Sequence, residues 1–558
     1  MKQHYQSVIY QIWPRSFKDS QNDGIGDLQG IISKLDYLAS LGIDYLWLSP
    51  IYASPNADYG YDVSDYYQIH PDFGTMEDFD TLLFEANRRG IKLIMDIVAN
   101  HTSIEHTWFQ SAQKDVSSPY RDFYYFMEGK GNHPPNNWIS IFGGSAWRRI
   151  EDNTYALALF TPSQVDLNWQ NPKVRNEVVR ILKFWLDKGV SGFRWDVINT
   201  ISKIDGLIDK NPNKKGLQFA DDYIINREPS LQYIDEIMSQ LSDYPDALMI
   251  GEGMLIDQAS AAKYAPNQMR RMDMMFHFDL HMLGCGPLGK YDFRKLYRFS
   301  TMDMKKVIFS WQKDMQDKGY WIGNYLSNHD QPRQISRFGD DKTYRVASGK
   351  ALAVLNFTLS GTPFVYQGEE IGMTNCHLDM DEWRDFEAKN GYLVLQSMMK
   401  LPAFLAKKIV MKMTRDHART VMQWTDETYA GFSNVNPWIK VNPNKDEISV
   451  QACEKDSNSL LHFYRKMIEL HKQIPAFTFG HFEPEYIKHP QLIAYRKEYN
   501  DESYLIVINF SKKMAICKLN GSWLDAQEVL YTHTTRSPWV KKMVLLPYEA
   551  RIMKINSF

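Results

Sequence analysis

The stretch GFRWDVINT, residues 192–200, has the apolar weight of a buried strand but contains two charged side chains. Phe193, Trp195 and Val197 carry the apolar pattern, and Arg194 and Asp196 interrupt it. Because residues two apart in a strand share a face, these two would point the same way, about 6–7 Å apart at ~3.3 Å per residue. A charged pair placed there is either a structural salt bridge or the floor of an active site.

Strand-like runs of this kind alternate with helix-like runs along most of the chain. The apolar spacing predicts strands at 8–13, 43–52, 91–101, 190–199, 247–253, 320–330 and 361–370, and helices at 30–42, 75–90, 171–189, 230–241 and 347–359. Strands that alternate with helices of this length form parallel sheets through βαβ units. At least six such repeats favour a closed (β/α)8 TIM barrel over an open sheet.

Two segments break this rhythm and indicate additional units. Residues 102–171 follow the third strand and are rich in Ser, Asn, Pro, Gly and Trp, so we expect an inserted subdomain there. After residue 480 the pattern becomes short strands without long helices, which predicts a C-terminal antiparallel β domain, a β-sandwich at 481–558. The barrel is then expected at 1–101 and 172–480.

The composition excludes several classes of function. The 558 residues carry 64 basic and 67 acidic side chains, a net charge of −3 with no basic block, so neither nucleic acid nor a membrane surface is an expected partner. The four cysteines are far apart and form no C-x-x-C pair. The N-terminal residues lack a signal-peptide core, and no run of 18 apolar residues exists. A cytoplasmic monomer without an organic cofactor is the expectation.

Polar side chains follow four of the predicted strands directly. They are Asn100 and His101, Arg194 and Asp196, Glu252, and His329 and Asp330. In a TIM barrel such strand ends line the active site, so three carboxylates, two histidines and an arginine would converge. Glycoside cleavage needs this kind of set, because it uses one carboxylate as nucleophile and one carboxylic acid as proton donor.

These strand ends also carry a resemblance. DIVANH (96–101), GFRWDVIN (192–199), GEG (251–253) and SNHD (327–330) look like the four signature regions of the α-amylase family of glycoside hydrolases. Residues 24–52 and 361–375 match its flanking regions, and QVDLN (164–168) resembles the QPDLN of the oligo-1,6-glucosidase branch. The resemblance runs from about residue 8 to the end of the chain, and implies a retaining enzyme that acts on a small oligosaccharide.

The resemblance assigns the catalytic roles position by position. It makes Asp196 the nucleophile, Glu252 the general acid and base, and Asp330 the carboxylate that supports the transition state. Arg194 beside Asp196 would favour the ionised nucleophile. Burial of Glu252 after the run ALMIG would raise its pKa, as a proton donor needs. In a retaining enzyme the two carboxyl groups are expected about 5–5.5 Å apart.

Further positions match the family's contacts to the terminal glucose. These are His101 and His329 for its hydroxyls, Asp58 for the terminal 4- and 6-hydroxyls, Tyr61 for stacking, and Arg194, Phe160, Gln164 and Arg415. A carboxylate on a terminal hydroxyl makes the pocket a dead end, which implies an exo-acting glucosidase.

Val197, directly after the nucleophile, resembles the α-1,6-preferring members of the family, because a branched side chain there would narrow the space for a 1,4-linked leaving group. Trp195, Val165 and Val421 depart from the usual pattern, as does GEGMLIDQAS at 251–260, so the leaving-group side of the site is expected to be unusual.

The loop DSQNDGIGD, residues 19–27, has oxygen-bearing groups at alternate positions. Asp19, Gln21, Asp23, the Ile25 carbonyl and Asp27 resemble the first part of a calcium loop. The family binds Ca²⁺ or Mg²⁺ here, usually with Asn in place of Gln21. A structural Ca²⁺ is expected, with a solvated acidic turn as the simpler alternative.

Two related activities stay open at this point, and a third, non-catalytic alternative is disfavoured. A trehalose-6-phosphate hydrolase shares NHDQPR, SRFGDD and GEEIGMTN, and would need a basic group such as Lys214 or Lys215 for the phosphate. A sucrose-active hydrolase or isomerase is another alternative. A non-catalytic, transporter-associated relative is disfavoured, because the three carboxylates are present and a membrane span is not.

Overall fold

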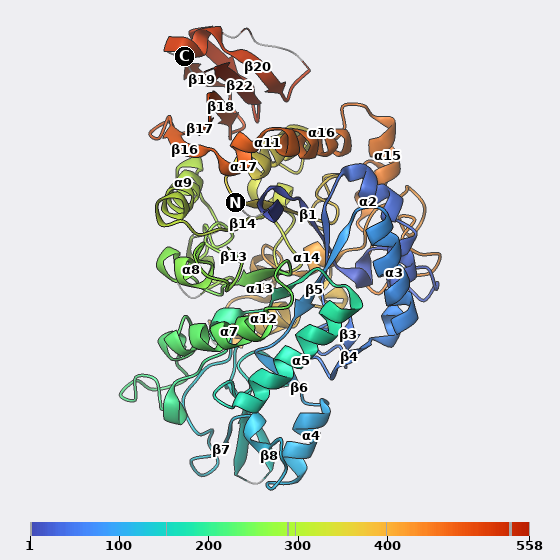
Figure 1. Ribbon diagram of the computed structural model, residues 1–558, viewed down its shortest axis with the longest axis vertical. Coiled ribbons are helices and arrows are strands. Elements are labelled where there is room, and N and C mark those ends of the chain that lie inside the picture. Colours follow the sequence, from blue (N-terminus) through green and yellow to red (C-terminus); the bar gives the residue numbers. More distant parts are fainter. Residues whose placement is uncertain are drawn as a thin grey trace.

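A barrel of eight parallel strands forms the centre of the molecule (Figure 1). The computed structural model describes residues 3–151, 153–286, 289–295, 297–397, 399–519, 521–534, 538 and 540–556. In sheet order the strands are β13 (Met274–Phe276), β12 (Leu248–Glu252), β11 (Gly192–Trp195), β5 (Lys92–Ile97), β2 (Tyr45–Leu48), β1 (Ile9–Ile12), β15 (Thr362–Tyr366) and β14 (Gly323–Asn324). A parallel bridge between Met275 and Ile322 joins the two ends of the sheet. The predicted (β/α)8 barrel is confirmed.

Helices cover the outside of the barrel. They include α3 (Met76–Arg88), α5 (Pro172–Lys188), α7 (Glu228–Gln240), α8 (Gln258–Tyr264), α9 (Thr301–Lys318) and α11 (Arg345–Thr358). In α5, Asn171 caps the first turn, Gly189 ends the helix in a left-handed conformation, and the apolar face from Val174 to Trp185 is buried. These are the start and stop signals that the sequence displays.

The structure corrects two of the predicted elements and adds a strand that the sequence did not predict. The helix expected at 30–42 is two helices, α1 (Leu28–Ile32) and α2 (Leu35–Leu41). At the break the Ser33 hydroxyl donates to the Gly30 carbonyl and so competes with helical hydrogen bonding. Of the strand expected at 320–330, only Gly323–Asn324 forms a strand of the sheet, preceded by Ile322 with its single bridge to Met275. Strand β13, three residues long, carries too little pattern to be found in the sequence.

The segment after β5 forms a separate lobe at one end of the molecule (Figure 1). Strands β6 (His101–Ser103) and β10 (Gln164–Asp166) pair antiparallel at its base, and α5 begins directly after it. Between them lie α4 (Thr107–Lys114) and a sheet of β7 (Phe126–Glu128), β9 (Thr154–Leu157) and β8 (Trp147–Glu151). Its apolar cluster includes Phe160 and also takes in Val197 from the barrel, so lobe and barrel share a core beside the nucleophile position.

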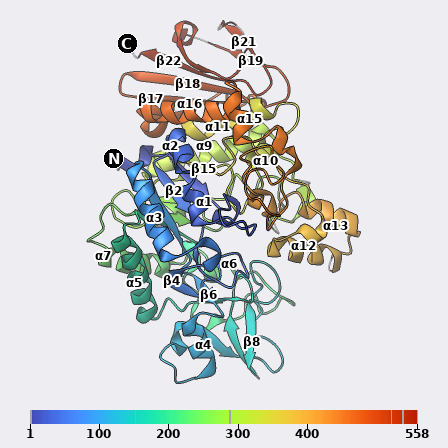
Figure 2. The ribbon, with the colours of Figure 1, turned by 90° about the vertical axis from the view of Figure 1, so that its right-hand side faces the viewer.

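Two helices project from the side of the barrel after β15 (Figure 2). They are α12 (Phe386–Ser397) and α13 (Ala403–Val410), which pack around Trp383, Leu395 and Ile409. The other strands and α-helices between residues 52 and 479 are β3 (Tyr52–Ala53), β4 (Asp65–Ile69), α6 (Asp221–Ile224), α10 (Gln334–Phe338), α14 (Asp416–Arg419), α15 (Val450–Lys455), α16 (Leu460–Gln473) and α17 (Pro475–Phe479).

The C-terminal segment forms two antiparallel sheets at the opposite end from the inserted lobe (Figure 1). One contains β16 (His481–Glu485), β17 (Leu492–Tyr499), β18 (Glu502–Asn509), β22 (Ala550–Asn556) and β20 (Gln527–Tyr531), and the other β19 (Ala515–Lys518) and β21 (Lys542–Leu545). Leu505, Cys517 and Met543 belong to the apolar cluster shared by the two sheets. In the described part of the chain no helix has the length and apolarity needed to cross a membrane.

Candidate active site

Arg194 is the centre of a buried charge cluster at the end of the barrel strands. Its side chain is fully buried, and Nη1 lies 2.8 Å from Asp96 Oδ1 and 2.7 Å from Asp196 Oδ1. Its Nη2 pairs with Glu252 Oε1 on the neighbouring strand. The stretch at 192–200 therefore contains a salt bridge that is also the floor of a carboxylate cluster.

The sheet register explains why Asp196 and Glu252 meet. Strands β11 and β12 are parallel, with Arg194 beside Ile250 and Trp195 beside Gly251. The next residue on each strand is Asp196 and Glu252, so the two carboxyls emerge at the same level of the same rim. Trp195 points the other way, fully buried, with Nε1 3.4 Å from Met249 Sδ.

For both Glu252 and Asp196, burial raises the pKa of the carboxyl group and Arg194 lowers it. Burial raises the pKa of Glu252, as expected of a proton donor, and Arg194 lowers it in part. Burial also raises the pKa of Asp196, and here the effect exceeds the lowering by Arg194. The expectation that Arg194 keeps Asp196 fully ionised is therefore incomplete. Two buried carboxyls that share one guanidinium titrate as a pair, and the state with one proton and one negative charge suits an acid and a nucleophile.

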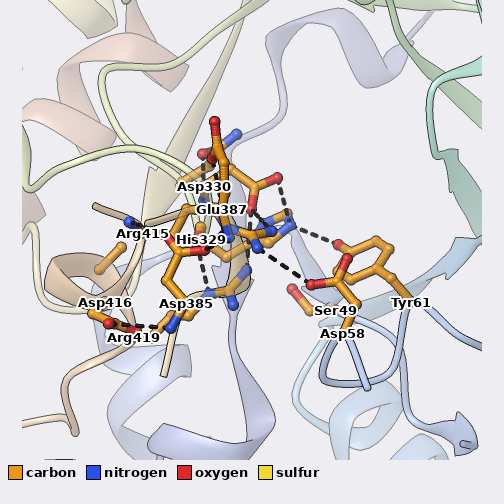
Figure 3. A network of polar contacts seen from close by, with 12 residues as sticks. Ser49, Asp58, Tyr61, His329, Asp330, Asp385, Glu387, Arg415, Asp416 and Arg419 are labelled. Atoms are coloured by element: carbon orange, nitrogen blue, oxygen red, sulfur yellow. Dashed lines mark hydrogen bonds and ion pairs between the residues drawn. The ribbon is translucent and has the colours of Figure 1, made fainter. Parts of the chain in front are cut away.

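Asp330 has the opposite electrostatics. Burial alone would raise its pKa, but His329, Arg415 and Arg419 hold the pKa well below its usual range. The His329 Nε2 lies 3.2 Å from Asp330 Oδ2, and Arg415 Nη1 and Arg419 Nη2 lie 3.5 and 3.2 Å from Oδ1. Figure 3 shows this network of contacts. The site thus combines a readily protonated pair with a carboxylate that stays charged.

Aromatic rings line one wall of the site. Tyr61 and His329 stack in parallel with ring centres 5.3 Å apart, and Tyr61 Oη lies 2.7 Å from His329 Nε2. Trp13 stacks on His329 as well, at 5.3 Å, and Gln11 Nε2 lies 2.8 Å from His329 Nδ1. The histidine is therefore fixed in both position and ring orientation.

The inserted lobe contributes the second group of side chains. Gln164, on β10, lies with Nε2 3.0 Å from His101 Nε2 and 3.4 Å from Asp58 Oδ2. Phe160 packs on the His101 ring at 5.1 Å. Burial lowers the pKa of His101 to about 4, so the ring is neutral at pH 7 and can both donate and accept hydrogen bonds.

Arg415 connects three carboxylates of the site. Its guanidinium lies 3.3 Å from Asp58 Oδ1 through Nη2 and 2.8 Å from Asp385 Oδ1 through Nε, besides its contact with Asp330 (Figure 3). Burial raises the pKa of Asp58, and Arg415 lowers it in part. The structure therefore brings all the candidate catalytic and sugar-contacting residues of the sequence into one connected network.

Val197 has an unusual backbone for a β-branched residue. Its φ of 37° and ψ of 43° lie in the left-handed region, where such residues are rare and strained. This turn aims the Val197 N–H at Glu252, with 3.2 Å from N to Oε2. The isopropyl group belongs, with Phe160, to the apolar cluster of the inserted lobe.

The predicted calcium loop is held by its own hydrogen bonds. Asp19 accepts from the backbone N–H of Asn22 and Gly24, and Asp27 accepts from Ser20 and caps α1. Among the described residues, no three histidine, cysteine, aspartate or glutamate side chains come together as a metal-binding group. A fit to Ca²⁺ would thus depend on the exposed Asp23, the Gln21 amide and the Ile25 carbonyl, and calcium here stays a prediction.

Sequence reasoning missed several members of the network. Asp96 holds Arg194 and also accepts from Tyr61 Oη at 3.0 Å. Asp385 holds Arg415, and Arg419 holds Asp330. Asp96 carried a usable signal, since it is a charged residue inside the apolar run IKLIMDIV, as Arg194 is in its own strand.

Comparisons with known proteins agree with this geometry. The family model for the α-amylase catalytic domain matches residues 11–480. An oligo-1,6-glucosidase of Parageobacillus thermoglucosidasius is 44% identical over 559 residues, covering 99% of this chain and 98% of that protein. The crystal structure of Bacillus licheniformis trehalose-6-phosphate hydrolase superposes with a TM-score of 0.93 at 38% identity over 100% of both chains. An isomaltulose synthase from Klebsiella sp. LX3 reaches 0.92 at 38% identity over 98% of both chains.

Proposed function

Because the chain belongs to the α-amylase family of glycoside hydrolases, we propose that it is a retaining, exo-acting α-glucosidase that releases terminal α-1,6-linked glucose from short isomalto-oligosaccharides. The observation that carries this proposal is the shared contact of Arg194 with Asp196 and Glu252, in the same contact network as the ion pair of Asp58 with Arg415. A carboxylate pair connected to a second group of charged side chains suits the recognition of a single terminal sugar.

In the first step of the proposed reaction, Asp196 attacks the anomeric carbon while Glu252 protonates the oxygen of the leaving sugar. The bond from carbon to the glycosidic oxygen breaks, and a glucosyl ester of Asp196 forms. Glu252, now ionised, then takes a proton from water, which hydrolyses the ester with net retention. Arg194 contacts both carboxyls and so supports the transfer of negative charge from one to the other.

Asp330 is proposed to stabilise the positive charge that develops on the sugar ring. Its pKa lies well below the usual range because His329, Arg415 and Arg419 surround it, so between the two pKa values it is negative while Glu252 is still protonated. Such fixed charges act strongly in a water-excluded site.

The substrate is the part of the proposal that needs a direct test. Product analysis over isomaltose, maltose, sucrose, trehalose and trehalose 6-phosphate, at equal enzyme concentration, would rank kcat/KM for each sugar. We expect isomaltose to rank first and glucose to be released as the α-anomer. A higher rank for trehalose 6-phosphate would favour that hydrolase activity, to which the structural similarity also points. Isomerised products from sucrose would contradict a simple hydrolase.

A further inference from the structure

Arg419 is a fully buried arginine that contacts the segment carrying Asp330 at two points. Its Nη2 lies 3.2 Å from Asp330 Oδ1, and its Nε donates to the His329 carbonyl at 3.2 Å. The guanidinium also lies over the ring of Trp13, with 4.6 Å from Cζ to the ring centre. Two polar contacts and one stacked face fix the planar group in a single orientation.

Trp13 links this contact to the ring of the neighbouring histidine. The same indole stacks on His329, with ring centres 5.3 Å apart. Arg419 and His329 therefore both rest on Trp13 while each contacts the Asp330 carboxylate. The arrangement restrains the carboxylate from two sides.

Arg419 differs in this respect from Arg415. Arg415 also contacts Asp330, but its guanidinium reaches Asp58, the residue that we expect to meet the terminal sugar (Figure 3). Arg419 instead contacts Asp330, the His329 carbonyl and the faces of two aromatic rings. Its action on a bound sugar would thus pass through Asp330.

We infer that Arg419 is a positioning residue for catalysis, which fixes the Asp330 carboxylate in place and keeps it negatively charged. The inference rests on the proposed function, because it takes Asp330 as the carboxylate that faces the transition state. It adds a role for a side chain on the short helix α14, far along the chain from the catalytic strand ends.

The charges around Asp330 indicate what removal of Arg419 would do. Burial raises the pKa of Asp330, and three neighbours lower it: His329, Arg415 and Arg419. The Lys290 ammonium donates to the Asp330 carbonyl at 2.9 Å. The other titratable groups that face it are Asp58, Glu252, Tyr61, Tyr325 and Tyr366. Without Arg419, burial and the two carboxyls are opposed by fewer cations, so the Asp330 pKa moves upward.

The test compares R419M and R419K with wild type, per folded molecule, over the pH range 4–8. For R419M we expect kcat to fall about tenfold or more, as for loss of a hydrogen bond to a charged group, with KM changed less than kcat. We also expect the acid limb of the kcat profile to move to higher pH. R419K keeps the charge but not the planar fork, so it should restore the acid limb and recover kcat only in part.

R551M supplies the matched control, because Arg551 is also buried and charge-paired, with Glu549, but lies in the C-terminal sheet. It should lower the melting temperature and leave kcat and the acid limb unchanged. An R419M enzyme that behaves like R551M would overturn the inference. If R419M does not fold, R419K decides: wild-type kcat in that variant would overturn it as well.

Failure of this inference can be distinguished from failure of the proposed function. The ratio of variant to wild type is measured on whichever α-glucoside of the panel the wild-type enzyme cleaves fastest. A preference for a sugar other than isomaltose would contradict the proposed substrate, yet the comparison of Arg419 variants would stand on that sugar. A wild-type enzyme with no activity on any α-glucoside would contradict both.

Discussion

The guanidinium of Arg194 lies 2.7 Å from a carboxylate oxygen of Asp196, two residues further along the same segment. The same guanidinium reaches Glu252 on the next strand. A single cation thus serves both carboxyls of the proposed double displacement, and neither carboxyl can change its charge without affecting the other.

Asp196→Ala should abolish hydrolysis, with kcat lowered by roughly 10⁴ or more, because loss of a nucleophile removes the covalent route. Sodium azide should partly restore turnover, since a small anion can occupy the space of the missing carboxylate and attack the same face of the sugar. The product would be β-glucosyl azide, identified by NMR. The exposed Asp501→Ala serves as the control with wild-type kcat. Activity near wild type in D196A would remove Asp196 from its proposed role.

Val197→Ala should raise the ratio of maltose to isomaltose turnover. The branched side chain lies directly after Asp196, in the same apolar cluster as Phe160, so its truncation opens space beside the leaving group. One or two methyl groups in a pocket change specificity by about 1–3 kcal/mol, or roughly 10–200-fold. The measurement is kcat/KM for both sugars in V197A, with V116A as the control, since Val116 is 78% exposed. An unchanged ratio would contradict the steric argument.

The strand ends could be found from the sequence because their signals are local. Each of them places a charged or amide side chain directly after an apolar run, and in a parallel barrel every such position lies on the same rim. The alternation of strands and helices was equally readable, since the helices carry caps and apolar faces. The barrel fold and the candidate catalytic carboxylates can therefore be predicted from patterns within short segments.

The positioning residues could not be found in this way, because their role exists only in three dimensions. Arg419 meets Asp330 across 89 residues, and Asp385 meets Arg415 across 30. Nothing in their own sequence surroundings indicates the partner. Burial is a similar case, since the net rise in the Asp196 pKa depends on how completely the neighbouring elements exclude water.

Calcium should raise the melting temperature if the loop at 19–27 binds it. A ligand present at about one hundred times its dissociation constant stabilises a protein by about 2.7 kcal/mol, and the loop offers oxygen ligands of the kind that Ca²⁺ prefers. Asp23→Ala should remove the effect, because Asp23 is exposed and accepts from the Ile25 N–H within the loop. The measurement is thermal unfolding in EDTA and in millimolar CaCl₂. Identical curves for wild type under both conditions would leave the simpler interpretation, a solvated acidic turn.

Glu369 predicts a pH dependence of stability that is separate from catalysis. It follows β15, is 2% exposed, and its Oε1 contacts the Ser327 hydroxyl while Oε2 has no hydrogen-bond partner. Burial raises its pKa from 4.5 to about 8. Between these values the folded protein holds a proton that the unfolded chain releases. The contribution of Glu369 to the free energy of unfolding is therefore most favourable below pH 4.5. It falls as pH rises toward 8, by about 1.4 kcal/mol per pH unit.

Glu369→Gln keeps the shape of the protonated acid but cannot ionise. Its melting temperature should therefore fall less than that of wild type between about pH 5 and pH 8, so that the difference between the two proteins changes steadily in favour of the variant. The exposed Glu77→Gln should instead follow wild type at every pH. Parallel curves for wild type and E369Q would mean that Glu369 is ionised in the folded protein, in which case a cation such as Arg333 must compensate it more strongly than burial disfavours it.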